Sequence, residues 1–148
     1  SNEELGKTVM SEQNAYILTK MMQDVVTSGT ATAITLDQTI NVAGKTGTTN
    51  NNSDGWFMGF TPSLVSGVWV GGEERDIHFD NMRDGQGAEM ALPIWGLYMN
   101  KVYADKSLGY LQTDTFAIPH NFDPCKDILA DDEAPAIEEK AGLDNLFQ

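Results

Sequence analysis

The stretch INVAGKTGTTNNNSDGWFMGFTPSLVSGVWVG, residues 40–71, decides the fold of this chain. It contains three short runs rich in β-branched and aromatic residues, a composition typical of strands. A polar turn, NNNSDG, separates the first two runs, and the tripeptide TPS links the second tightly to the third. The runs 40–49, 55–61 and 64–71 therefore predict a three-stranded antiparallel meander.

An amphipathic segment, SEQNAYILTKMMQDVVTSGTA at 11–31, precedes these runs. Ser11 suits a helix N-cap, and Gly29 stands where a helix commonly stops. The apolar residues between them repeat at helical spacing, which predicts one helix with a core-facing stripe. That stripe comprises Ile17, Leu18, Met21, Met22, Val25 and Val26.

A second helix is predicted for MALPIWGLYMNKVYA at 90–104, with Pro93 in its first turn. The residues expected to face the sheet are Ile94, Trp95, Leu97, Tyr98 and Val102. A small antiparallel sheet flanked by two helices is an α+β arrangement. We interpret Trp56, Phe57, Trp69 and Trp95 as core residues.

The remaining segments carry weaker patterns. Residues 73–87 are polar and punctuated by glycine, which indicates a loop. Apolar periodicity fades after 107, so residues 1–107 are expected to form the folded unit. Residues 108–148 are expected to run as an extended strap followed by an acidic, irregular tail.

The charge and composition exclude several classes of function. The chain has 148 residues with 22 acidic and 9 basic side chains, for a net charge of −13, so nucleic acid is not an expected partner. Cys125 is the single cysteine, and His78 and His120 form no metal-binding pair. No cofactor and no metal are therefore expected.

The cluster GKTGT at 44–48 fits two chemistries. A phosphate-binding P-loop, G-x-x-x-x-G-K-[ST], would need glycine at position 39, but Thr39 stands there and a turn follows instead of a helix. The other chemistry is the K-T-G element of serine acyl-transferases that react with penicillin. The neighbouring residues therefore favour the second chemistry.

Each residue of this element has a physical use beside a substrate. Lys45 places a positive charge near a substrate carboxylate, and the Thr46 and Thr48 hydroxyls can donate hydrogen bonds to it. Gly47 removes a side chain where substrate approaches the backbone. The Thr48 N–H can serve as half of an oxyanion hole. We expect Lys45 and Thr48 to be catalytic, and Thr46, Gly47 and Thr48 to bind substrate.

The context of the cluster makes the resemblance specific. The segments SEQNAYILTKMMQDVVTSGTA, VAGKTGTTNNNSDGWFMGFTPSLVSGVWVGGEE and MALPIWGLYM, in this order, closely resemble the C-terminal half of the transpeptidase domain of class A penicillin-binding proteins. These are bifunctional peptidoglycan synthases. The resemblance implies that 1–107 is the C-terminal part of a penicillin-binding transpeptidase, or serine β-lactamase-like, fold with a five-stranded antiparallel sheet.

The resemblance also implies a reaction. A serine attacks the D-Ala-D-Ala end of a stem peptide, D-alanine leaves, and an amine of a neighbouring stem takes the acyl group. β-Lactams imitate the donor and stay bound. The implied partners are peptidoglycan stem peptides and β-lactams, and the implied location is the outer face of the bacterial cytoplasmic membrane.

The family's S-x-x-K and S-x-N motifs do not occur in this sequence. None of the seven serines is followed by lysine at the third position or by asparagine at the second. We therefore expect this chain alone to be inactive, whereas its parent is a serine-type D,D-transpeptidase. The alternatives are a fragment of a β-lactamase or β-lactam sensor, and a non-catalytic peptide- or protein-binding module.

Two further expectations follow. No run of residues approaches the roughly 18 apolar positions of a membrane span, and no targeting segment opens this chain. If two strands of the family's sheet come from elsewhere, the meander presents open strand edges. Self-association through those edges is then expected.

Overall fold

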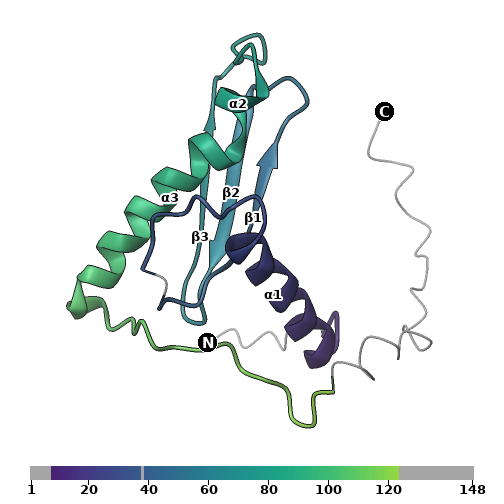
Figure 1. Ribbon diagram of the computed structural model, residues 1–148, viewed down its shortest axis with the longest axis vertical. Helices are drawn as coiled ribbons and strands as arrows, with labels where there is room; N and C mark the ends of the chain where they lie inside the picture. Colours follow the sequence, from purple (N-terminus) through teal and green to yellow (C-terminus); the bar gives the residue numbers. More distant parts are fainter. Residues whose placement is uncertain (1–7, 38, 124–148) are drawn as a thin grey trace, which may run out of the picture.

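The computed structural model describes residues 8–37 and 39–123 (Figure 1). The three strands pair antiparallel in the order β1-β2-β3, so the predicted meander with two long helices is confirmed. The elements in chain order are α1 (Glu12–Thr27), β1 (Ala43–Thr48), β2 (Asp54–Phe60), β3 (Val65–Gly71), α2 (Met82–Gly85), α3 (Gly87–Ala104) and a 3-10 turn, η1 (Lys106–Leu108).

Both long helices pack against the same face of the sheet. Val25 and Val26 of α1 contact the buried cluster that also contains Trp95 and Met99 of α3. Figure 1 shows α3 lying along the sheet and α1 beside β1. The helix-bearing face is therefore the one on which this chain builds its core.

Trp95 is the centre of that core. Its ring lies 5.1 Å from the ring of Phe57 in an edge-on contact, and its indole N–H donates to the Ser66 carbonyl at 3.2 Å. Gly59 makes room for it, because a Cβ at Gly59 would lie 2.6 Å from the Trp95 ring. Full burial of such side chains stabilises the fold by roughly 1.5–3 kcal/mol each.

The described residues leave the middle of the opposite face of the sheet, here called the bare face, uncovered, although Phe116 packs on Phe60 at one end of it. Side chains alternate between faces along a strand, so the neighbours of Phe57 point away from the helices. Trp56, Met58 and Trp69 are 46%, 47% and 46% exposed. The interpretation of Trp56 and Trp69 as core residues is therefore wrong, whereas Phe57 and Trp95 are completely buried.

The predicted faces of both helices need correction. On α3, Ile94, Leu97 and Tyr98 are exposed, whereas Trp95 and Val102 are buried as predicted, together with Ala91, Leu92 and Met99. On α1, Leu18 and Met21 are 44% and 61% exposed, and no residue is fully buried. The predicted stripe of adjacent apolar residues on α1 is wider than the surface with which α1 contacts the sheet. The reason is that α1 meets the sheet mainly along one edge strand, β1.

The start of α3 also differs from expectation. The helix begins at Gly87 instead of near Met90, so Pro93 lies within the helix and not in its first turn. Proline removes one backbone donor, but Pro93 is on the exposed side of α3, where water can satisfy the freed carbonyl. The segment 73–87, expected to be a loop, contains the short helix α2.

Beyond η1, residues 109–123 form neither helix nor strand and run across the end of the sheet (Figure 1). Phe116 packs on Phe60 with ring centres 5.6 Å apart, and Phe122 packs on Tyr16 at 4.9 Å. The Asp114 carbonyl accepts a hydrogen bond from the Asn41 amide at 2.9 Å. This segment thus links β2 to α1. The acidic tail and Cys125 lie outside the described residues.

Candidate functional site

The K-T-G element forms β1, which is an edge strand of the sheet. The Thr49 N–H donates to the Asp54 carbonyl at 3.1 Å, which extends the pairing of β1 with β2 by one position. Bonded and non-bonded positions alternate along an antiparallel pair. The backbone N–H and C=O groups of Thr46 and Thr48 therefore point outward, to the open edge of β1.

The Lys45 side chain bends over this edge. Lys45 is exposed, and its ammonium donates to the Thr46 carbonyl at 2.8 Å and lies 3.5 Å from the Thr46 hydroxyl. No carboxylate of the described residues pairs with it. A positive charge without a carboxylate partner is available to an anionic ligand at the edge.

The two threonine hydroxyls are held by different elements. The Thr46 hydroxyl shares a hydrogen bond of 2.8 Å with the hydroxyl of Thr30, which follows α1. The Thr48 hydroxyl accepts a hydrogen bond of 3.0 Å from the backbone N–H of Gly87, the first residue of α3. The turn after α1 thus holds one hydroxyl of the K-T-G strand, and the first residue of α3 holds the other.

Several hydrogen bonds hold the turn after β1 in place. The Thr49 hydroxyl lies 3.0 Å from that of Ser53 and accepts from the Asp54 N–H at 3.1 Å. Asn52 adopts a left-handed conformation with φ of 53°, which asparagine tolerates well. Its backbone carbonyl accepts from the Phe79 N–H at 3.3 Å. The end of the K-T-G strand is therefore anchored to the loop before α2.

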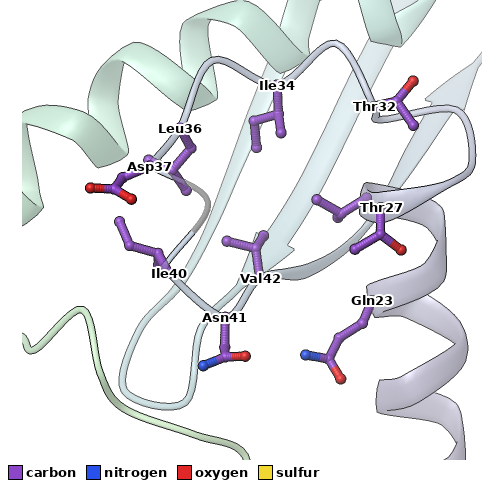
Figure 2. Close-up of a pocket in the computed structure, with 10 residues that line it drawn as sticks. Gln23, Thr27, Thr32, Ile34, Leu36, Asp37, Ile40, Asn41 and Val42 are labelled. Atoms are coloured by element: carbon purple, nitrogen blue, oxygen red, sulfur yellow. The ribbon is translucent and has the colours of Figure 1, made fainter.

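A separate cavity lies on the helix-bearing side, between α1 and the segment leading into β1 (Figure 2). Its volume is about 400 Å³, and none of its lining residues belongs to 45–48. Val26, Ile34 and Val42 supply aliphatic side chains, and the amides of Gln23 and Asn41 lie at one end. No lysine, arginine or histidine lines the cavity, so its lining offers no cationic side chain to an anionic ligand.

Asp37 stands at the rim of that cavity. Its pKa lies below the ordinary carboxyl value, first because the Thr39 N–H donates to it at 3.0 Å and second because the Thr39 hydroxyl donates at 2.8 Å. Burial opposes this shift only slightly, since the carboxyl is fully exposed. Asp37 therefore serves to close a turn and stays ionised at neutral pH.

Other classes of site find no support in the described part of the chain. Residues 8–37 and 39–123 contain no group of three or more His, Cys, Asp or Glu side chains placed to hold a metal ion. Among the helices described there, none is long and apolar enough to cross a membrane.

Comparisons with known proteins identify the family of the chain. Residues 1–73 match the family model described as the penicillin binding protein transpeptidase domain. The chain carries part of a transpeptidase domain of the class A penicillin-binding proteins. Penicillin-binding protein 1A of Neisseria gonorrhoeae is 45% identical over 87 residues, which cover 59% of this chain and 10% of that protein. Penicillin-binding protein 1A of Pseudomonas aeruginosa is 38% identical over 120 residues, 80% of this chain and 14% of that protein.

A solved structure shares the fold. The 2.6 Å crystal structure of penicillin-binding protein 1A from Haemophilus influenzae matches with a TM-score of 0.57 and 30% identity, over 66% of this chain and 16% of that one. The α+β fold of this penicillin-binding protein chain is thereby confirmed. The chain spans only about a tenth to a seventh of the length of these curated relatives.

The structure places the predicted site residues of this penicillin-binding protein chain along one edge. The Lys45 ammonium lies close to the Thr46 hydroxyl, and Thr48, two residues further along β1, contacts the N-terminus of α3. Sequence reasoning missed Thr30 and Gly87, which hold the two hydroxyls. Gly87 lies at the end of the segment expected to be a loop, and its spacing before the ALPIW run was the only signal that could have found it.

Proposed function

We propose that this chain supplies the K-T-G wall of a serine D,D-transpeptidase that cross-links peptidoglycan stem peptides and binds penicillin. The observation that carries the proposal is the open edge of β1, where the Lys45 ammonium lies beside outward-facing backbone groups of Thr46 and Thr48. An extended peptide pairs along such an edge through its main chain. The terminal carboxylate of a stem peptide would lie near Lys45.

The roles of the site residues follow from this placement. Lys45 and the hydroxyls of Thr46 and Thr48 attract and bind the donor carboxylate. Gly47 keeps the approach to the strand clear. The outward Thr48 N–H stabilises negative charge on the carbonyl oxygen under attack, as half of an oxyanion hole. A serine outside this sequence attacks that carbonyl, D-alanine leaves, and an amine of a second stem peptide accepts the acyl group.

The bare face of the sheet supports a role within a larger domain. Trp56, Met58 and Trp69 present large apolar side chains that are about half exposed, and apolar surface of this kind is stabilised by burial. We propose that the rest of the transpeptidase domain, which brings the nucleophile, covers this face. The active parent would then work on the outer face of the bacterial cytoplasmic membrane.

The decisive experiment uses a fluorescent penicillin and the full-length protein that contains this chain. We expect covalent label that survives denaturation on the full-length protein and no label on the chain 1–148 alone. Lys45→Ala should lower the rate of acylation by roughly 10²–10³-fold, the loss typical of a removed electrostatic contact in an active site. Lys101→Ala, at an exposed position of α3, is the matched control and should acylate normally.

Three results would contradict the proposal. One is stable labelling of the chain alone, since it would require a nucleophile within residues 1–148. Another is full-length protein that never labels, which would favour a binding module without chemistry. The third is label that is rapidly released with turnover, which would indicate a β-lactamase.

A further inference from the structure

The first residue of α3 is in direct contact with the K-T-G strand. Gly87 is buried, and its backbone N–H donates to the Thr48 hydroxyl oxygen at 3.0 Å. The N-cap residue, Gln86, provides no side-chain hydrogen bond to the helix. The first N–H groups of a helix lack partners within the helix. The Gly87 N–H at the start of α3 instead donates to Thr48, a residue of the candidate active site.

The contact requires glycine on the helix. A Cβ at Gly87 would lie 2.5 Å from the Gly47 carbonyl oxygen and still closer to that of Trp56. Across the interface, a Cβ at Gly55 would lie 3.2 Å from the Gly87 Cα. The N-terminus of α3 therefore rests directly on the backbones of β1 and β2. Any side chain at position 87 would push the helix away from Thr48.

The hydrogen bond determines what the Thr48 hydroxyl can do. A hydroxyl has one proton to donate and two lone pairs to accept. Because one lone pair is taken by the Gly87 N–H, the proton stays available for another acceptor. The partial positive charge at a helix N-terminus also makes the nearby hydroxyl a better donor to an anion. Thr48 is thus prepared to donate to a carboxylate.

We infer that Gly87 is a positioning residue for carboxylate recognition: its N–H and its lack of a side chain hold the Thr48 hydroxyl as a donor to the carboxylate of the acyl donor. This inference rests on the proposed function and deepens it. Gly87 acts through Thr48 and touches no substrate itself. Its effect should therefore appear only with donors that carry a free carboxylate.

The test compares two acyl donors on the full-length protein: a penicillin with its free carboxylate, and the same penicillin as its methyl ester. Gly87→Ala should lower the acylation rate with the free acid about tenfold or more, the factor expected for a lost charge-assisted hydrogen bond. With the ester the rate should change by less than about twofold. Thr48→Val should give the same pattern, and the double variant should lose no more than either single variant.

Gly96→Ala is the matched control, because it also adds one methyl group to α3. Its Cβ would meet no atom closer than the Thr35 hydroxyl, at 3.4 Å, and it should leave both acylation rates unchanged. Equal losses with the free acid and the ester in Gly87→Ala would overturn the inference, as would additive losses in the double variant. Either would show that position 87 matters only for packing.

A second measurement does not depend on activity or on the folding of Gly87→Ala. Thr48→Val removes the acceptor of the Gly87 N–H while keeping the shape of the side chain, so amide hydrogen exchange at Gly87 should become at least several-fold faster. Thr48→Ser should restore slow exchange. Unchanged exchange in Thr48→Val would overturn the inference. Wild-type protein that acylates no donor would instead refute the proposed function.

Discussion

The two faces of the sheet are built from alternate residues of the same strands, yet they end in opposite environments. On one face, Phe57 is completely buried beneath Trp95, and Gly59 leaves room for the indole ring. On the other, Trp56 and Trp69 contact each other at a tilt, with ring centres 6.3 Å apart, and remain nearly half exposed. Both faces carry aromatic side chains, so the difference in their exposure arises from which elements cover each face.

An antiparallel sheet with one face in water normally alternates apolar and polar residues. β2 does not: its sequence DGWFMGF places large apolar residues on both sides. A strand of that composition is suited to a sheet buried on both faces. The candidate site lies where the two faces meet, since Lys45 belongs to the bare face by alternation and the Thr46 and Thr48 hydroxyls belong to the helix-bearing face.

The largest expected effect compares one tryptophan from each face. Trp95→Ala should lower the free energy of unfolding of the chain by about 3–5 kcal/mol, because it empties the centre of the core. Trp56→Ala should cost only about 1–2 kcal/mol, since half of its ring is already in water. Equilibrium urea unfolding of both variants measures the difference. Equal losses would show that the bare face is covered in the isolated chain.

The strands and helices were predictable from sequence because each rests on local signals. Turn residues separate the three strands, and Ser11 caps α1 by accepting from the Asn14 N–H at 3.2 Å. The type and order of these elements therefore follow from short stretches of residues. The burial of each side chain does not, because it depends on what packs against each face.

Trp56 and Ile94 show that the local sequence pattern does not determine which side chains are buried. Both occupy positions that pattern reasoning assigns to a core, and both are about half exposed. For the candidate site, the K-T-G pattern proposes Lys45 to Thr48, but nothing local indicates that the N–H of Gly87, 39 residues beyond Thr48, holds the Thr48 hydroxyl. Contacts between distant segments require the fold itself.

A smaller effect compares one glycine from each face. Gly59→Ala should destabilise the chain by about 1–3 kcal/mol, because the new methyl group collides with the buried Trp95 ring and the core has no room to relax. Gly67→Ala meets the sulfur of Met58, whose flexible side chain is 47% exposed and can turn away. Its cost should stay below about 1 kcal/mol. Similar thermal shifts in the two variants would mean that Met58 is not free to move.

The smallest effect concerns association of the isolated chain. An uncovered aromatic face favours self-association, in addition to pairing at open strand edges. Met58→Lys puts a charge in the middle of that face, so sedimentation equilibrium should show dimerisation weakened several-fold. Leu97→Lys is the control, because Leu97 is 61% exposed on α3, on the far side of the core. Dimerisation weakened equally by both substitutions would mean that net charge controls association. If neither has an effect, the contact between copies runs through the edges of β1 and β3, and the bare face needs its own domain partner, not a second copy, to be covered.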